Sequence, residues 1–242
     1  MLVGSRLHAR HDGSRAMNGW MTVAGRLAVV TACCLLTGCS LIDGTRQDGV
    51  DQAERVAEPI RIELNAEQPS KSFGTIVVNG TLNRFEVGYG KYGIACEGSR
   101  FEEGWTPLGR FRVNAVLTAD RFEMDPDLVA QSGQSPDQLR QDLFANMISI
   151  DFDGDGENGE YGGGYISLAP IPDTDQPFEF NHYAGTFRWY SFAIHGTNNL
   201  DKIGRKSTGG CVNVNDMSLS MILDTVQLGD DVVISSSGPC TP

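Results

Sequence analysis

The sequence predicts a single mainly β domain with a few helices, and three observations lead to this fold class. Glycine accounts for 29 of 242 residues, about 12% against an average of about 7%, which favours turns and strands over long helices. Apolar residues (40%) and charged residues (21%) are present in ordinary globular proportions, which excludes a disordered chain and a polytopic membrane protein. Short apolar runs alternate with polar residues and are separated by Gly, Asn and Asp, as in strands joined by turns.

The formal net charge is −12, from 19 Lys and Arg against 31 Asp and Glu. Binding of nucleic acid phosphates requires clustered Lys and Arg, and the sequence contains no such cluster. We therefore expect no nucleic acid partner.

Eight strands are expected from the apolar pattern. In the first, Ile60, Ile62 and Leu64 alternate with the charged residues Arg61 and Glu63, so one face is apolar and the other polar. The other seven are expected at residues 74–78, 84–89, 110–117, 147–152, 165–168, 187–194 and 231–235.

Two helices are expected. The first follows Ser135, an N-cap residue type with Pro136 at the first helical position, and Leu139, Leu143 and Met147 share one of its faces. The second follows Asn215 or Asp216 and is stopped by Gly229. Its apolar residues have i, i+3, i+4, i+7 spacing, which predicts core packing and no cofactor site. They are Leu219, Ile222, Leu223 and Val226.

The first 38 residues have the composition of a targeting signal. Four Arg precede an 11-residue apolar run at residues 27–37, which is too short to span a bilayer. The run ends in Leu36-Thr37-Gly38-Cys39, which resembles the bacterial lipobox. That resemblance implies a lipoprotein signal peptide at residues 1–38 and acylation of Cys39. An uncleaved N-terminal anchor, or secretion with a cut after a small residue, is the alternative.

Residues 39–57 are polar and acidic, and we interpret them as a lipidated tether to a domain of residues 58–242. Attached to a membrane in this way, the chain is expected in the cell envelope. In Gram-negative lipoproteins an Asp after the acylated Cys resembles a retention signal for the inner membrane. Ser40 stands there instead, which indicates the outer membrane, facing the periplasm, if the source is Gram-negative.

Apart from the expected anchor Cys39, three cysteines remain after the signal, namely Cys96, Cys211 and Cys240. An exported chain with an odd number of cysteines either pairs two and leaves one free, or forms a bond between molecules.

Cys211 and His195 form a candidate nucleophile and base. A thiol attacks carbonyl groups as the thiolate, and a nearby imidazole accepts its proton. Gly209 and Gly210 precede the cysteine, and their lack of Cβ atoms allows backbone N–H groups to converge as an oxyanion hole. The alternative is a structural role, with Cys211 buried or in a disulfide and His195 in the core.

The same segment resembles the signature of the YkuD-type L,D-transpeptidases, and the resemblance covers residues 73–236. The signature has His-Gly-Thr, a loop, then Ser/Thr-x-Gly-Cys with an apolar residue and Arg or Asn. Many members have His where this chain has Gly209, which concerns the substrate pocket and not the nucleophile. The matching segments are Ile194-His195-Gly196-Thr197, Thr208-Gly209-Gly210-Cys211-Val212-Asn213 and Thr106-Pro107-Leu108-Gly109-Arg110-Phe111.

The resemblance implies an L,D-transpeptidase-like β-sandwich and a role for each motif residue. Cys211 is the nucleophile, His195 the general base and then acid, and the Gly196 carbonyl orients the imidazole. Backbone N–H groups of Gly210 and Cys211, with Gly209 as a further candidate, hold the oxyanion. Thr208 and Asn213 shape the turn and the substrate contacts. Upstream, Trp189 and Tyr190 either line the groove or belong to the core, and His182 is expected to be solvated in a polar loop.

The implied reaction acts on peptidoglycan tetrapeptide stems, in cell-wall biosynthesis. Cys211 forms a thioester with release of D-Ala, and an amine takes the acyl group, giving a 3→3 cross-link or an exchanged D-amino acid. Carbapenems are implied as covalent inhibitors, and no cofactor is required. One alternative is a hydrolase with the same Cys–His pair. Another is a non-catalytic, calcium-stabilised cell-wall-binding lipoprotein.

If Cys211 remains a thiol, Cys96 and Cys240 are left as the candidate disulfide, which would attach the tail to the domain.

An acidic segment resembles half of a calcium-binding loop. Asp151, Asp153 and Asp155 are followed by Gly156, as in the first half of an EF-hand loop. The twelfth position is Gly162 in place of the usual Glu. The segment is therefore either a structural Ca²⁺ site of shorter geometry or a solvated acidic turn.

Overall fold

The structure is a computed structural model that describes residues 58–146, 159, 161–172 and 179–242. Its main feature is a nine-stranded sheet. Eight of the strands have the order β14-β12-β9-β7-β15-β1-β2-β3, and β8 pairs with the C-terminal part of β7. The strands of this sheet are β1 (Ile60–Asn65), β2 (Phe73–Val78), β3 (Thr81–Glu86), β7 (Gly109–Leu117), β8 (Phe122–Met124), β9 (Tyr165–Ile171), β12 (Phe192–His195), β14 (Val212–Asn213) and β15 (Asp231–Ser237).

Three two-stranded sheets and several helices complete the described part of the chain. The small sheets pair β4 (Tyr89–Gly90) with β13 (Lys206–Thr208), β5 (Gly93–Ala95) with β6 (Trp105–Pro107), and β10 (Glu179–Tyr183) with β11 (Thr186–Tyr190). The α-helices are α1 (Pro126–Ser132), α2 (Pro136–Asn146) and α3 (Asp216–Leu223), and the 3₁₀-helices are η1 (Pro69–Lys71) and η2 (Leu200–Lys202). Among the described residues, no helix has the length and apolar character needed to cross a membrane.

Two strand pairs of the large sheet are parallel. β1 runs parallel to β15, with Ile60 opposite Val232, and lies between β15 and the β2–β3 hairpin. β12 runs parallel to β14, with Ile194 opposite Val212. The other pairs in this sheet are antiparallel.

Apolar side chains form two clusters, one on each face of the sheet. Along β7, Phe111 and Val113 belong to the first cluster, whereas Ala115 and Leu117 belong to the second. A register shift between Val113 and Ala115 against β9 accounts for this exchange of faces, because residues two apart on a regular strand point the same way. Helix α3 packs on the first cluster, and α1, α2 and β11 contribute to the second.

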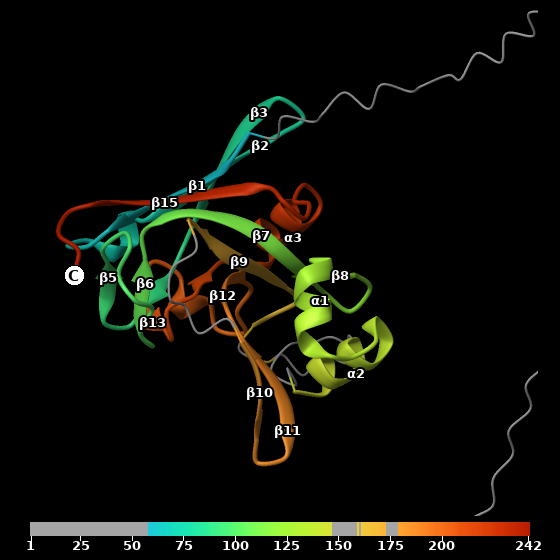
Figure 1. Cartoon of the computed structure of the whole chain (residues 1–242). Helices are drawn as coiled ribbons and strands as arrows, with labels where there is room; N and C mark the ends of the chain where they lie inside the picture. The colour runs from blue at the N-terminus through green and yellow to red at the C-terminus, as the bar shows by residue number, and fades with distance from the viewer. Residues whose placement is uncertain (1–57, 147–158, 160, 173–178) are drawn as a thin grey trace, which may run out of the picture. The chain divides into compact units, whose positions relative to one another are not determined.

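The view in Figure 1 shows where these elements lie around the sheet. Helices α1 and α2 lie together near β8, at one end of the large sheet. The β2–β3 and β10–β11 hairpins extend in opposite directions from the body of the domain.

The mainly β fold with a few helices is confirmed. In β1, Ile60, Ile62 and Leu64 are buried while Arg61 and Glu63 are exposed, as the alternation predicts. Two expected strands are in fact each divided. Residues 84–89 include the end of β3 and the start of β4, and residues 187–194 include β11 and β12, which Ser191 separates.

The helix boundaries also differ in part from expectation. Asn215 caps α3 through a hydrogen bond from the Ser218 N–H at 2.8 Å. That helix ends at Leu223 and does not continue to Gly229, although Val226 beyond it is still buried. Helix α1 has the same Asp/Ser-Pro start as α2 and was not expected. The expected strand at 147–152 lies outside the described residues.

Candidate active site

His195 and Cys211 lie side by side because of the parallel register of β12 and β14. His195 is the last residue of β12, and Cys211 directly precedes β14, whose Val212 pairs with Ile194. Cys211 therefore lies beside Ala193, and its side chain points to the same face as Ala193 and His195. The two side chains are therefore diagonal neighbours on one face of this strand pair.

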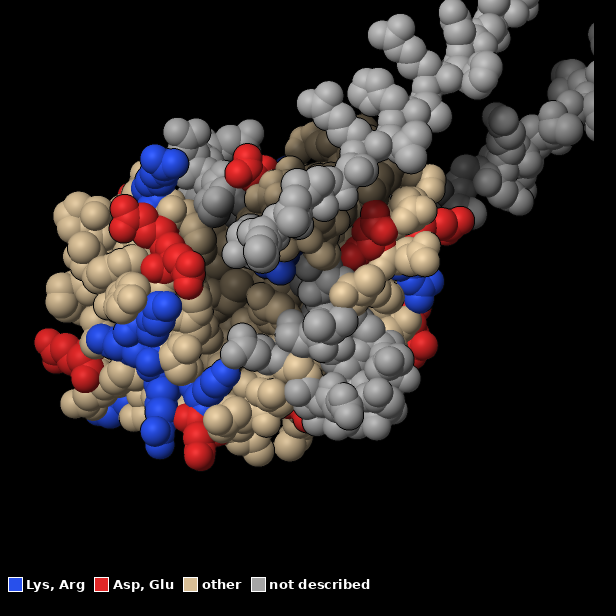
Figure 2. All heavy atoms as spheres, turned by 90° about the horizontal axis from the view of Figure 1, so that it is seen from below, with Lys and Arg blue, Asp and Glu red and all other residues tan. Residues whose placement is uncertain are grey.

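Both side chains line one cavity of about 660 Å³. The face seen from below in Figure 2 is hollowed, and charged side chains of both signs lie around the hollow. The lining residues of the cavity are Lys91, Phe101, Glu103, Tyr161, Tyr190, Ser191, His195, Lys202, Ser207, Thr208, Gly209, Cys211 and Asn213.

The imidazole of His195 is held by the next peptide group. Its Nδ1 lies 2.6 Å from the carbonyl oxygen of Gly196. Since a carbonyl only accepts, Nδ1 carries the proton and donates it, which leaves Nε2 as the basic nitrogen. Burial lowers the pKa of His195 to about 4, against the raising effect of the Gly196 hydrogen bond. The ring is therefore a neutral base at neutral pH.

Two tyrosines enclose this imidazole. The ring of Tyr161 meets it edge-on with centroids 4.7 Å apart, and the ring of Tyr165 is stacked at 6.3 Å. The backbone of Gly196 also lies close to the backbone of Tyr161 and Gly162. A Cβ on Gly196 would lie 2.9 Å from the Tyr161 carbonyl oxygen and 3.0 Å from the Cα of Gly162. Glycine at position 196 is thus required by this close approach.

Cys211 is a half-buried free thiol. Its Sγ lies 4.0 Å from the carbonyl oxygen of Ser191. Burial raises the pKa of the Cys211 thiol to about 11, although neighbouring backbone groups lower it in part. In this resting arrangement the thiol and imidazole are both neutral.

Ser191 also belongs to a buried hydrogen-bond network. The Tyr165 hydroxyl lies 3.0 Å from the Ser191 carbonyl oxygen and 2.8 Å from its Oγ, and Ser167 Oγ lies 2.8 Å from the same Oγ. The Ser191 carbonyl that faces the thiol is thereby fixed by a side chain on β9.

The turn before the nucleophile is held by the side chain of Thr208. Thr208 Oγ1 donates to the Cys211 carbonyl oxygen at 2.6 Å and accepts from the Gly210 N–H at 3.1 Å. Gly210 has φ +130°, and a Cβ there would lie 2.8 Å from the Trp105 carbonyl oxygen. Both features explain glycine at this position.

This geometry alters the expected oxyanion hole. The Gly210 N–H is already bound to Thr208, so it differs from the expected role as an oxyanion donor. The backbone N–H groups of Gly209 and Cys211 are the other candidate oxyanion donors of this turn.

Asn213 lies behind the nucleophile with its side chain 1% exposed. Its Oδ1 is buried and has no hydrogen-bond partner among the described residues. Its backbone N–H and carbonyl are bound to Gly88 at 3.1 and 2.9 Å. A Cβ on Gly88 would lie 2.2 Å from Oδ1, so glycine makes room for this amide beside the cavity.

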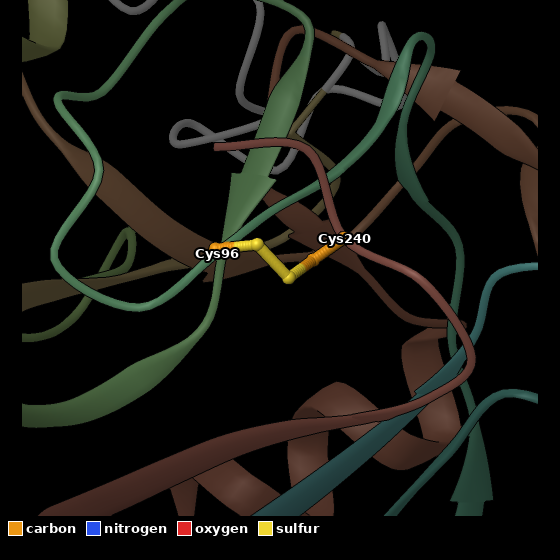
Figure 3. The surroundings of a disulfide bond; sticks show 2 residues. All are labelled: Cys96 and Cys240. Carbon is orange, nitrogen blue, oxygen red and sulfur yellow. A yellow bond between two sulfur atoms is a disulfide. The ribbon is translucent and has the colours of Figure 1, made fainter.

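Cys96 and Cys240 form a disulfide, with Cα atoms 5.0 Å apart, and Figure 3 shows its surroundings. It attaches the C-terminal tail to the end of β5. Backbone hydrogen bonds reinforce this attachment, from Cys96 N–H to the Thr241 carbonyl and from Thr241 N–H to the Ile94 carbonyl, each at 2.8 Å.

The remaining site predictions have mixed outcomes. Trp189 is buried, while Tyr190 is exposed and lines the cavity. His182 is exposed, but it lies on β10 and not in a loop. The calcium candidates Asp151, Asp153 and Asp155 lie outside the described residues, and the described part contains no cluster of three metal-ligating side chains. Cys39 lies outside the described residues too.

Several lining residues were not foreseen from the sequence. Lys91, Phe101 and Glu103 reach the cavity from the segments around β4–β6, and Tyr161 and Lys202 from the segments around His195. Lys202 could have been identified from the sequence, because it lies between His195 and Cys211 in the same segment. The others depend on strand pairings that are distant in sequence.

Comparison with protein families identifies one match. The YkuD family, described as the L,D-transpeptidase catalytic domain, matches residues 64–234, which is more than half of the chain. No curated protein sequence matches the chain.

Similar solved structures include L,D-transpeptidase 3 from Mycobacterium tuberculosis in complex with a faropenem-derived adduct, with 12% identity over 73% of this chain and 60% of that one and a TM-score of 0.37. An L,D-transpeptidase from Mycobacterium smegmatis has 16% identity over 73% and 58%, with a TM-score of 0.32. The L,D-transpeptidase from Xylanimonas cellulosilytica has 14% identity over 74% and 62%, with a TM-score of 0.31. The chain thus spans less than two thirds of each of these proteins. On the strength of the match over residues 64–234, the chain belongs to the YkuD family of L,D-transpeptidase catalytic domains.

Proposed function

We propose that the chain is a cysteine-dependent L,D-transpeptidase that acts on peptidoglycan tetrapeptide stems. The observation that carries the proposal is the free thiol of Cys211 on one cavity with His195, whose Nδ1 is bound to the Gly196 carbonyl. This hydrogen bond selects the tautomer in which Nε2 accepts a proton. A backbone carbonyl here takes the place of a triad carboxylate.

In the first half of the reaction, Nε2 of His195 accepts the thiol proton as Sγ bonds to the carbonyl carbon at the L-centre of the third stem residue. The N–H groups of Gly209 and Cys211 stabilise the oxyanion. The C–N bond to D-Ala then breaks, and the leaving amine takes the proton from Nε2. A thioester on Cys211 and free D-Ala result.

In the second half, an amine attacks the thioester and transfers a proton to Nε2. The C–S bond breaks, and the proton returns to the sulfur. A stem amine gives a 3→3 cross-link, and a free D-amino acid gives an exchanged stem. Carbapenems are proposed to acylate the same sulfur, since their strained amide is open to the same attack.

The protonation states set how the first step begins. With the pKa of His195 near 4 and that of Cys211 near 11, the resting pair is thiol and imidazole. We propose that proton transfer accompanies attack on the carbonyl. The developing charge is offset by the oxyanion donors within the partly closed cavity.

We also propose that the chain is lipidated at Cys39 and is held at a membrane of the cell envelope. The support for this proposal is the lipobox-like sequence before Cys39. An anchor at Cys39 would hold the proposed activity beside the peptidoglycan substrate.

Mass spectrometry of the intact protein with a purified disaccharide tetrapeptide tests the enzymatic proposal. We expect a transient acyl adduct on Cys211, loss of D-Ala and a dimeric 3→3 product, and none of these in Cys211→Ala. Tripeptide without dimer or exchange product, even with acceptor amine supplied, would assign a hydrolase. Murein binding by a folded protein, without adduct or product, would contradict an enzymatic role and favour a wall-binding module.

A further inference from the structure

The charge of the cavity lining is opposite in sign to that of the chain. The lining includes Lys91 and Lys202 and a single acid, Glu103, whereas the whole chain has a net charge of −12. Lys91 and Glu103 form an ion pair at 3.5 Å, with both side chains substantially exposed. A cationic lining in an acidic protein favours an anionic ligand group inside this cavity.

Lys202 is half-buried, and its backbone is held in place at the cavity. It ends the 3₁₀-helix η2, which Asn199 caps through the Asp201 N–H at 2.9 Å. The Lys202 N–H donates to the Asn199 carbonyl at 3.0 Å, and the Lys202 carbonyl accepts from Ser207 Oγ at 3.2 Å. The lysine side chain thus starts from a fixed point on the wall that also carries Ser207 and Cys211.

The ammonium group of Lys202 is close enough to affect the imidazole. Its positive charge adds to burial in lowering the pKa of His195. Lys202 and His195 also line the same cavity.

The proposed chemistry places a carboxylate in this cavity, near the imidazole. His195 protonates the amine of the departing D-Ala, and the carboxylate of D-Ala is attached to the carbon that bears this amine. When the amine lies at hydrogen-bond distance from Nε2, the carboxylate is only a few ångströms further away. A lysine that lines the cavity beside the imidazole is suited to bind it.

We propose that Lys202 binds the free C-terminal carboxylate of the donor stem, and so makes the cavity specific for donors in which the scissile bond precedes the last residue. This inference rests on the proposed function, and adds to it the residue that selects the substrate end. Because the ion pair helps to bind and orient the donor, it acts on kcat/KM.

Two donor stems that differ at one group test the proposal. One is the disaccharide tetrapeptide with a free terminal carboxylate, and the other is the same molecule with a terminal carboxamide. Release of D-Ala or of D-alaninamide is measured for the wild type, Lys202→Met and Lys202→Arg. Lys71→Met is the matched control, because Lys71 is exposed and also ends a three-residue 3₁₀-helix.

We expect the wild type to prefer the carboxylate by at least about tenfold in kcat/KM, in line with the strength of charge-assisted hydrogen bonds. Lys202→Met should reduce this ratio to near one, Lys202→Arg should keep most of it, and Lys71→Met should leave it unchanged. Loss of the Lys202 charge also raises the pKa of His195, but that effect is common to both donors and cancels in the ratio.

The wild-type ratio alone tests the proposal if Lys202→Met does not fold, since equal rates on the two donors would overturn it. A Lys202→Met variant that loses activity equally on both donors would also overturn it, and would assign Lys202 a structural role. Absence of an acyl adduct and of product with both donors in the wild type would instead contradict the proposed function itself.

Discussion

The hydroxyl of Thr106 donates a hydrogen bond to the carbonyl oxygen of Gly210 at 2.6 Å, although 104 residues separate the two. The same hydroxyl oxygen accepts the Gly90 N–H at 2.8 Å, and Thr106 is fully buried. One side chain on β6 therefore joins β4 to the turn that presents the nucleophile.

Thr106→Val should destabilise the fold and loosen this turn. The substitution keeps the shape but leaves the Gly90 N–H and the Gly210 carbonyl without their buried partner, at a cost of roughly 1–3 kcal/mol. Urea unfolding measures this loss, and D-Ala release measures the accompanying fall in activity. Thr81→Val at the exposed start of β3 is the control, with an expected change within about 0.5 kcal/mol. Equal stability of the two variants would contradict the role given to Thr106.

Gly196→Ala should disturb the imidazole more than the added volume suggests. The new Cβ would meet the Tyr161 carbonyl oxygen and the Gly162 Cα at 2.9 and 3.0 Å, so the backbone that orients His195 must move. We expect a loss of about 1–3 kcal/mol in stability and at least a tenfold lower kcat. Gly163→Ala, which faces open space, should keep wild-type kcat and melting temperature. A normal kcat in Gly196→Ala would show that the carbonyl contact is dispensable.

Acid should destabilise the wild type more than His195→Asn. The folded protein holds the pKa of His195 near 4, mainly through burial, whereas the unfolded chain binds a proton below about pH 6.5. This contribution to stability is complete above pH 6.5 and is lost as the pH falls towards 4. The loss of unfolding free energy amounts to about 3 kcal/mol at pH 4. Urea unfolding at pH 7.5 and 4.5 measures the difference, and identical pH dependence in the two proteins would refute it.

Alkylation of Cys211 should accelerate with pH well beyond neutrality. Burial raises the pKa of its thiol from 9.0 to about 11, and only the thiolate reacts rapidly with iodoacetamide. The rate in the free enzyme should therefore rise through pH 9 and 10, with Cys211→Ala as the blank. A plateau already reached near pH 6 would indicate a thiolate–imidazolium pair instead.

Loss of the Cys96–Cys240 disulfide should lower stability by roughly 2–5 kcal/mol, because the bond closes a loop across a separation of 144 residues. The double variant Cys96→Ser and Cys240→Ser is compared with Cys211→Ala, which removes one thiol without opening the loop. Thermal unfolding should show a clearly larger decrease in the double variant. Equal melting temperatures would mean that the tail is held by its backbone hydrogen bonds alone.

Local patterns in the sequence were sufficient for much of the sheet. The alternation around Ile62 and the caps at Ser135 and Asn215 predicted elements that the structure contains. The boundary at Ser191 was missed because it depends on a hydrogen bond from Tyr165 on another strand. In the sequence only the single Ser191 interrupts the apolar and aromatic run, which is a weak turn signal.

The catalytic candidates are close in sequence, and the walls of their cavity are not. His195 and Cys211 belong to one signature of about 20 residues, which can be recognised directly in the sequence. Lys91 and Glu103 reach the cavity from the segments around β4–β6. Here β4 pairs with β13, and β6 is joined to the nucleophile turn by the bond from Thr106 to Gly210. Contacts across such separations leave no periodic signal.

The place of β1 determines the order in which this domain can be completed. The first strand of the domain is an inner strand, between β2 and the last strand, β15. During synthesis, β1, β2 and β3 therefore emerge long before their link to the rest of the sheet exists. Closing this long-range contact is slow, and until then the hairpin edge is exposed to other chains. A chain truncated before residue 231 thus lacks the strand that joins β1–β3 to β7 and the rest of the sheet.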